Sequence, residues 1–98
     1  MNHANHVRLN ANELNQATLH GASIYDREDE EISTIDHVHG TGNTAQIVFD
    51  VGGFLGIGAK RVALYANQLA FMRDEDGVVH AVTQVTEEQL KALPEHVD

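Results

Sequence analysis

Residues 50–66 read DVGGFLGIGAKRVALYA, a segment that joins the end of one expected strand to the beginning of the next. Glycine adopts backbone angles that other residues rarely reach, and four glycines fall here within seven residues: Gly52, Gly53, Gly56 and Gly58. Three large apolar residues stand among them: Phe54, Leu55 and Ile57. In a water-soluble chain such side chains need cover, either from the chain's own core or from a second subunit or partner. Residues 52–58 are therefore the candidate interface of this protein.

The residues on both sides of this segment alternate between apolar and polar side chains. Before it, one face of an extended chain would carry Ala45, Ile47, Phe49 and Val51. Val48 is the apolar exception on the other face. After it, residues 61–66 show the same alternation. A period of two predicts two strands, each with one buried face.

Four further strands are expected, at residues 17–25, 31–39, 68–73 and 78–84. Acidic turns at 26–31 and 74–77 and a glycine-containing turn at 40–43 separate the strands. A β-bulge near Ser33 would reconcile the irregular apolar spacing of 31–39, because one extra residue reverses the facing of everything after it. Five or six short strands with such turns predict a mainly β chain that forms a small β-barrel.

The end of the chain carries the signals of a short helix over residues 86–93. Thr86 is a favourable N-cap, and Gln89 three residues later completes a capping box. Pro94 marks the end of the helix. Leu90 and Leu93 would then dock on the barrel.

Residues 1–16 contain five asparagines and few side chains that could pack in a core. Asparagine favours turns and caps over the interior of regular elements. We therefore predict a flexible N-terminal arm over residues 1–16, with a short helical turn around 13–16. A single domain over residues 17–98 follows it and includes the C-terminal helix.

The glycine segment and its flanking strands resemble the signature of the PRC-barrel family, and the resemblance covers residues 19–96. Members of this family of small β-barrels include a domain of the photosynthetic reaction-centre H subunit and a domain of a ribosome maturation factor. Ser33 stands where members commonly have glycine, and Tyr65 where they often have proline. The resemblance implies a PRC-type barrel that serves as a docking surface on a larger assembly.

Composition narrows the classes of function. Fifteen acidic residues against six basic ones give a formal charge of -9, which repels nucleic-acid phosphates and anionic lipid. The chain has no cysteine, which fits a reducing compartment. The first residues contain no apolar run typical of a signal peptide or a membrane span. We therefore expect a cytoplasmic chain that neither binds nucleic acid on its own nor inserts directly into a membrane.

The glycines do not favour a phosphate-binding loop. Their order, G-x-x-G-x-G, reverses the dinucleotide fingerprint, and a strand pattern follows where a helix would be needed. Lys60 and Arg61 are the only adjacent bases in the sequence. We expect them to pair with Asp50 across the loop, with neutralisation of a partner's carboxylates as the alternative. Exposed ion pairs of this kind contribute about 0–1 kcal/mol.

His37 and His39 lie two residues apart and would point the same way from a strand, a spacing that can supply two metal ligands. A third ligand could come from His20 or His80 through the fold. Surface histidines are the commoner explanation, so we assign no metal and no cofactor and keep His37 and His39 as weak candidates. The acidic runs are typical of solvated turns, and a nucleophilic triad is not evident, so we expect no enzymatic activity.

Two functions remain open from the sequence. The first is a non-catalytic protein–protein interaction module, expected to form a homodimer through the glycine segment, a strand edge, or both. The second is a small-ligand or metal-responsive binding protein that uses the barrel mouth or the histidines. A role in photosynthesis or ribosome assembly would rest on family analogy alone.

Overall fold

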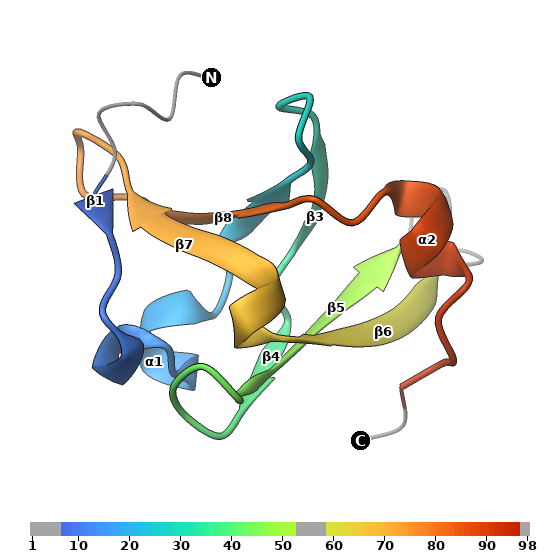
Figure 1. The fold of residues 1–98 in the computed structure, drawn as a ribbon, viewed down its shortest axis with the longest axis horizontal. Coiled ribbons are helices and arrows are strands. Elements are labelled where there is room, and N and C mark those ends of the chain that lie inside the picture. Colours follow the sequence, from blue (N-terminus) through green and yellow to red (C-terminus); the bar gives the residue numbers. More distant parts are fainter. Residues whose placement is uncertain (1–6, 53–58, 97–98) are drawn as a thin grey trace.

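The computed structural model describes residues 7–52 and 59–96 of the chain. Strands dominate these residues and form two sheets (Figure 1), so the expectation of a mainly β chain is confirmed. The larger sheet has the strand order β1 (Val7–Arg8), β7 (Leu69–Arg73), β8 (Val79–Thr83), β2 (Ser23–Tyr25) and β3 (Glu31–Thr34). The smaller sheet has the order β4 (His37–His39), β5 (Gln46–Val51) and β6 (Lys60–Tyr65).

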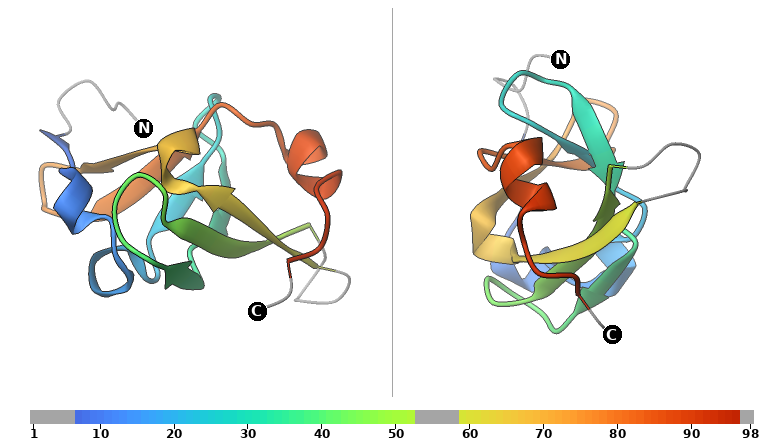
Figure 2. Two further views of the ribbon diagram at one scale, coloured as in Figure 1. Left: turned by 60° about the horizontal axis from the view of Figure 1, so that its bottom comes forward. Right: turned by 90° about the vertical axis from the view of Figure 1, so that its right-hand side faces the viewer.

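Neighbouring strands run antiparallel except β2 and β8, which pair in parallel. Within the described ranges the two sheets are not hydrogen-bonded into one closed barrel. They face each other across a shared interior, as the end-on view in Figure 2 shows. The sequence predicted six strands at most. The described residues form eight, because β1 is added and residues 31–39 are divided into β3 and β4.

The core lies between the two sheets. The inward positions of β5 are all but completely buried, as the alternation predicts: Ile47, Phe49 and Val51. They face apolar residues of the larger sheet within one continuous cluster, which includes Ile24, Phe71 and Ala81. Val48, on the opposite face of β5, is also fully buried. Its neighbours in register are His37 on β4 and Ala63 on β6.

The chain passes from one sheet to the other between two consecutive residues. The N–H of Ile35 donates to the carbonyl of Ala22 at 2.8 Å, which continues the pairing of β3 with β2. The N–H of Asp36 donates instead to the carbonyl of Val48 at 3.0 Å, which begins the pairing of β4 with β5. Ile35 itself is 1% exposed. This corner brings both sheets around the same buried side chains.

A β-bulge is present near Ser33, where it was predicted. Ile24 on β2 pairs with Ser33, but the next residue, Tyr25, pairs with Glu31, so β3 carries one extra residue at this point. A bulge leaves that residue unpaired and strengthens the local twist of the strand. The twist leads directly into the corner at Ile35.

The C-terminal helix α2 (Glu87–Lys91) lies over one end of the interior between the sheets and contacts both β5 and β6 (Figure 2). The Thr86 hydroxyl accepts from the N–H of Gln89 at 3.1 Å, and the Gln89 side chain accepts from the N–H of Thr86 at 3.0 Å. This reciprocal pair is the predicted capping box. Leu90 is 0% exposed and Leu93 packs against the core, so the predicted docking face is confirmed.

Residues 7–16, which were predicted as part of a flexible arm, pair with and pack against the rest of the domain. Val7 and Arg8 form β1 and pair with β7, and a 3-10 turn, η1 (Ala11–Glu13), follows. Leu14 is 6% exposed and belongs to the core cluster. Leu14 in the core, with Leu9 packed against it, and the pairing of β1 with β7 therefore fasten the segment to the domain. Residues 1–6 lie outside the described part of the chain.

The strand predicted at residues 17–25 begins later than expected. Its first residues form the short helix α1 (Gln16–Leu19), and β2 starts at Ser23. The Asn15 side chain accepts from the N–H of Thr18 at 2.9 Å, which caps the helix. Leu19 is fully buried. Local capping by asparagine and burial of one leucine thus outweigh the strand preference of the small and β-branched residues around them.

An ion pair ties the N-terminal segment to β7. The Arg73 guanidinium donates to the Glu13 carboxylate at 2.6 Å, and the Asn10 N–H donates to the same side chain at 3.0 Å. The hydrogen bond from the Asn10 backbone, followed by that from Arg73, lowers the pKa of the Glu13 carboxyl below its ordinary value of 4.5.

We expect Leu90→Ala to lower the free energy of unfolding by about 2–5 kcal/mol, because it removes a fully buried side chain and leaves a cavity. Chemical denaturation followed by circular dichroism measures this change. Glu88→Ala is the matched control, since Glu88 is exposed on the same helix. Equal effects of the two substitutions would contradict the docking of α2 on the core.

We expect Glu13→Gln to lower the melting temperature at pH 7, with the difference from the wild type shrinking as the pH falls below about 4.5. The lowered pKa of Glu13 in the folded chain stabilises the fold above the ordinary value of 4.5, and that contribution is lost as the carboxyl is protonated. Glu75→Gln, in an exposed turn, is the control. A pH-independent difference would show that the charge of Glu13 has no role.

Candidate functional site

The structure places one residue of the predicted interface, Gly52, at the end of β5. Its φ is +72°, a conformation that favours glycine, and the residue is exposed. A Cβ at this position would lie 3.0 Å from the Cε of Lys91, so α2 packs close to the start of the segment. The other predicted interface residues lie outside the described part of the chain: Gly53, Phe54, Leu55, Gly56, Ile57 and Gly58.

The predicted ion pair between Arg61 and Asp50 is present, but a second carboxylate, that of Asp36, lies nearer to the Arg61 guanidinium. Arg61 lies opposite Asp50 in the register of β5 and β6, with 3.5 Å between Nε and Oδ1. Asp36, which the sequence did not indicate, lies nearer, at 2.7 Å from Nη2. Lys60 donates to the main-chain carbonyl of Lys91 at 2.9 Å. The corner between β3 and β4 brings Asp36 to this position, and no local sequence signal marks it.

Histidines gather on the outer face of the smaller sheet. The rings of His37 and His39 lie 4.3 Å apart between centroids, as their spacing on a strand predicts. The third ring is that of His96, 6.0 Å from His39, and not that of His20 or His80. His20 lies at the end of α1, and His80 packs edge-on against Tyr25 in the larger sheet at 5.9 Å. We call His37, His39 and His96 the histidine cluster.

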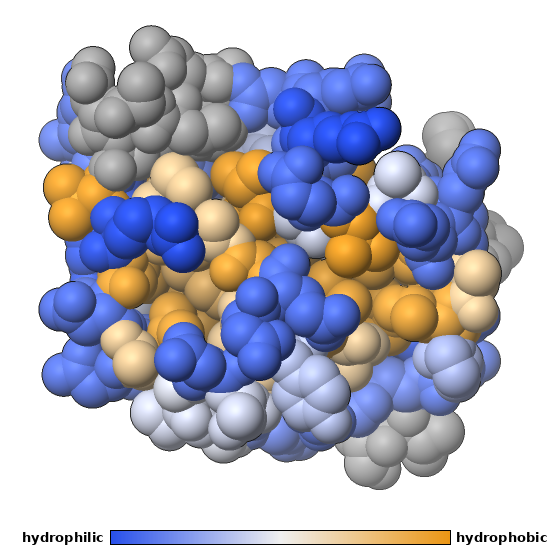
Figure 3. All heavy atoms as spheres, viewed as in Figure 1, coloured by the Kyte–Doolittle hydropathy of each residue, from blue (hydrophilic) through white to orange (hydrophobic). Residues whose placement is uncertain are grey.

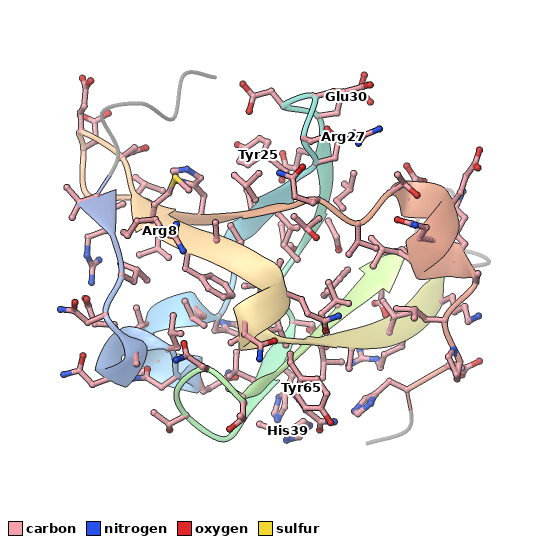
Figure 4. The ribbon with its side chains drawn as sticks, viewed as in Figure 1. Arg8, Tyr25, Arg27, Glu30, His39 and Tyr65 are labelled. Carbon is pink, nitrogen blue, oxygen red and sulfur yellow. The ribbon has the colours of Figure 1, made fainter. Side chains whose placement is uncertain are left out.

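The backbone of His96, one residue of the histidine cluster, is bonded to the smaller sheet. The N–H of His96 donates to the carbonyl of Arg61 at 2.8 Å. Tyr65 and His39 lie on the same face, in one row of the sheet with Gln46 between them (Figure 4). Among residues 7–52 and 59–96, no three His, Cys, Asp or Glu side chains are arranged to hold a metal ion.

The outer edge of β6 is a feature that the sequence did not specify. In antiparallel strands, the N–H and C=O of one residue point to the same side and alternate from residue to residue. The N–H of Ala66 donates to the carbonyl of Ala45 at 2.8 Å, so even-numbered residues of this strand face β5. The bond from His96 to the carbonyl of Arg61 shows that odd-numbered residues face outward. The outward groups of β6 therefore belong to Arg61, Ala63 and Tyr65.

Two of these three residues already have partners at this edge. Arg61 accepts from His96, and the N–H of Tyr65 donates to the side chain of Gln68 in the turn η2 (Ala66–Gln68) at 2.8 Å. Within the described ranges, the outward N–H and C=O of Ala63 have no hydrogen-bond partner. We call the backbone of residues 61–65 on this side the β6 edge.

The other sheet edges have contacts of their own. The N–H of Val38 on β4 donates to the side chain of Gln16 at 2.7 Å. On β3, the Ser33 hydroxyl donates to the carbonyl of Asp50 at 2.6 Å, which connects that strand to β5. β1 is two residues long. Short or covered edges protect a sheet from pairing with other chains.

The described surface has several hollows. One of about 490 Å³ lies along α2 and is lined by Thr86, Glu87, Glu88 and Lys91. A second, of about 290 Å³, lies between β1, η1 and η2 and is lined by Arg8, Leu9, Leu14, Asn43, Ala66, Asn67, Leu69 and Phe71. Another of about 140 Å³ lies between the β2–β3 turn and the start of α2. None of these three linings contains a histidine. Figure 3 shows apolar side chains surfacing between hydrophilic ones across one face of the molecule.

Both acidic runs form tight turns. The Asp26 carboxylate accepts from the N–H groups of Glu28 and Glu30 at 2.8 and 3.0 Å. The Asp74 carboxylate accepts in the same way from Asp76 and Val78, at 2.9 Å in both cases. In each run the first aspartate thus satisfies the backbone of the turn that it begins.

Comparison with known proteins finds no family model that matches the chain and no curated protein with significant similarity to it. No helix in the described ranges is long and apolar enough to cross a membrane.

We expect Asp36→Asn to destabilise the chain more than Asp50→Asn does, because Asp36 lies nearer to the Arg61 guanidinium. Both carboxylates are about half exposed, so the effects should stay within about 1 kcal/mol and decrease with added salt. Thermal unfolding at low and high salt measures them. A larger effect of Asp50→Asn would contradict the order of the two distances.

Proposed function

We propose that this chain is a non-catalytic protein–protein interaction module that associates with itself, docking through the glycine segment and a sheet edge. The observation that carries the proposal is the position of the large apolar side chains that the described surface exposes: Val7, Tyr65 and Val78. Val7 is on β1 and Tyr65 ends β6, two edge strands, and Val78 stands in the turn before β8. Apolar side chains beside an unpaired edge favour binding by strand addition.

The resemblance of residues 19–96 to the PRC-barrel family supports the same function, because that family's domains dock on larger assemblies. We propose that the two sheets and the glycine segment together form a PRC-type arrangement. The first aspartate of each acidic run accepts hydrogen bonds from the backbone of its own turn, which favours a structural role for these carboxylates and binding over catalysis. The composition favours a cytoplasmic location.

A second candidate function is metal-responsive or small-ligand binding. The close approach of His37 and His39, 4.3 Å between ring centroids, favours it. Zinc and nickel bind pairs of imidazoles, and additional ligands can come from water or a partner. Thermal unfolding with added zinc tests this function. A rise in melting temperature that His39→Ala abolishes would favour it over a module that binds protein alone.

Light scattering from micromolar to millimolar protein tests self-association. We expect the mass to approach twice the 10.7 kDa of the chain as the concentration rises. We also expect the double substitution Phe54→Asp and Leu55→Asp to lower either that mass or the melting temperature, since both side chains need cover. Thr41→Asp with Thr44→Asp adds the same charge at two exposed positions and is the control. A strictly monomeric wild type would overturn the proposal.

A further inference from the structure

We infer that a second copy of this chain pairs with the β6 edge, in antiparallel orientation, around a two-fold axis at Ala63. The inference rests on the self-association proposed above and names the backbone that carries it. It joins the two smaller sheets into one sheet of six strands, with the two β6 strands at its centre. The argument has three parts: available backbone groups, a self-complementary register, and local charge.

The available groups set the centre of the pairing. Ala63 has both its N–H and its C=O directed away from β5, and these groups have no other partner in the described ranges. Arg61 and Tyr65, on either side, are each partly occupied, by His96 and Gln68. Two copies related by a two-fold axis at Ala63 exchange two N–H···O=C bonds between their Ala63 residues, and Tyr65 of the second copy then takes the place beside Arg61 that the His96 segment holds in the single chain.

The resulting register is complementary. With Ala63 opposite Ala63 of the second copy, Arg61 lies opposite Tyr65, twice by symmetry. A guanidinium beside an aromatic ring is a favourable pair, and Tyr65 is available because it is 52% exposed. Lys60 falls opposite Ala66. This register therefore places no two like charges directly opposite each other.

Charge favours this surface over the rest of the molecule. Two copies that each carry a formal charge of -9 repel each other. Around β6, however, three bases meet three carboxylates: Lys60, Arg61 and Lys91 lie with Asp36, Asp50 and Glu87, and Arg61 and Lys91 are in ion pairs. This set is neutral, so the excess negative charge belongs to the remaining residues. Contact through the β6 edge therefore adds no net repulsion from these six side chains.

Ala63→Pro tests the inference directly. Proline lacks the N–H, and its ring would lie on the outward side, where no bond within the sheet is lost. We expect the variant to remain folded by circular dichroism and to be monomeric by light scattering at concentrations where the wild type is a dimer. Ala63→Thr keeps the N–H and suits a strand, so it is the matched control and should remain dimeric.

Tyr65→Lys provides a second test that does not alter the backbone. It places a lysine opposite Arg61 of the second copy at two symmetric positions, and the exposed position of Tyr65 makes misfolding no concern. We expect the dissociation constant of the dimer to rise by about tenfold or more. Tyr65→Phe keeps the ring and should change the constant little.

The outcomes separate this inference from the proposed function. A folded Ala63→Pro or Tyr65→Lys variant that dimerises like the wild type overturns pairing at the β6 edge and leaves self-association through the glycine segment standing. A wild type that stays monomeric at every concentration overturns both. If Ala63→Pro does not fold, Tyr65→Lys alone decides.

Discussion

The central position of β5 in the smaller sheet is the constraint on which the rest of the structure depends. One set of its side chains, Ile47, Phe49 and Val51, is buried in the core shared by both sheets. Because backbone direction alternates along the strand, the same register fixes which groups of β6 are used inside the sheet and which point outward. The alternation along β5 and β6 therefore determines both which side chains enter the core and which backbone groups of β6 remain at the exposed edge.

The chain surrounds this core with few residues by turning sharply between its sheets. Ile35 and Asp36 bond to different sheets although they are neighbours in sequence, and the bulge beside Ser33 supplies twist just before them. α2 then covers the open end with Leu90. After α2 the chain continues to His96, whose backbone bonds to β6 and whose ring joins the histidine cluster. The end of the chain therefore limits how much of the β6 edge remains available.

Sequence patterns predicted the elements whose signals are local. The alternation in β5, the capping box of Thr86 and Gln89, and the bulge near Ser33 each depend on residues close in sequence, and each is present. The N-terminal segment was harder to predict, because its polar composition conceals Leu14, which packs in the core. The residues directly beside Leu14 are polar, so only the tertiary fold shows that it is buried.

The sequence predicted those parts of the candidate site that depend on residues within one strand or one strand pair. The pairing of His37 with His39 and the alignment of Arg61 with Asp50 follow from strand geometry. Asp36 and His96 reach the site from distant parts of the chain, through the corner at Ile35 and through the segment after α2. Which sheet edge stays open depends on all of these long-range contacts. The β6 edge therefore became visible only in the structure.

Residue-resolved amide hydrogen exchange, measured by NMR at low and high protein concentration, tests the central claim most directly. In dilute solution the account predicts rapid exchange at Ala63, whose N–H points outward, beside slow exchange at Leu64, whose N–H points toward β5. At high concentration Ala63 should become protected while Leu64 changes little. Slow exchange at Ala63 in the dilute monomer, or rapid exchange at Ala63 in a demonstrated dimer, would contradict the account.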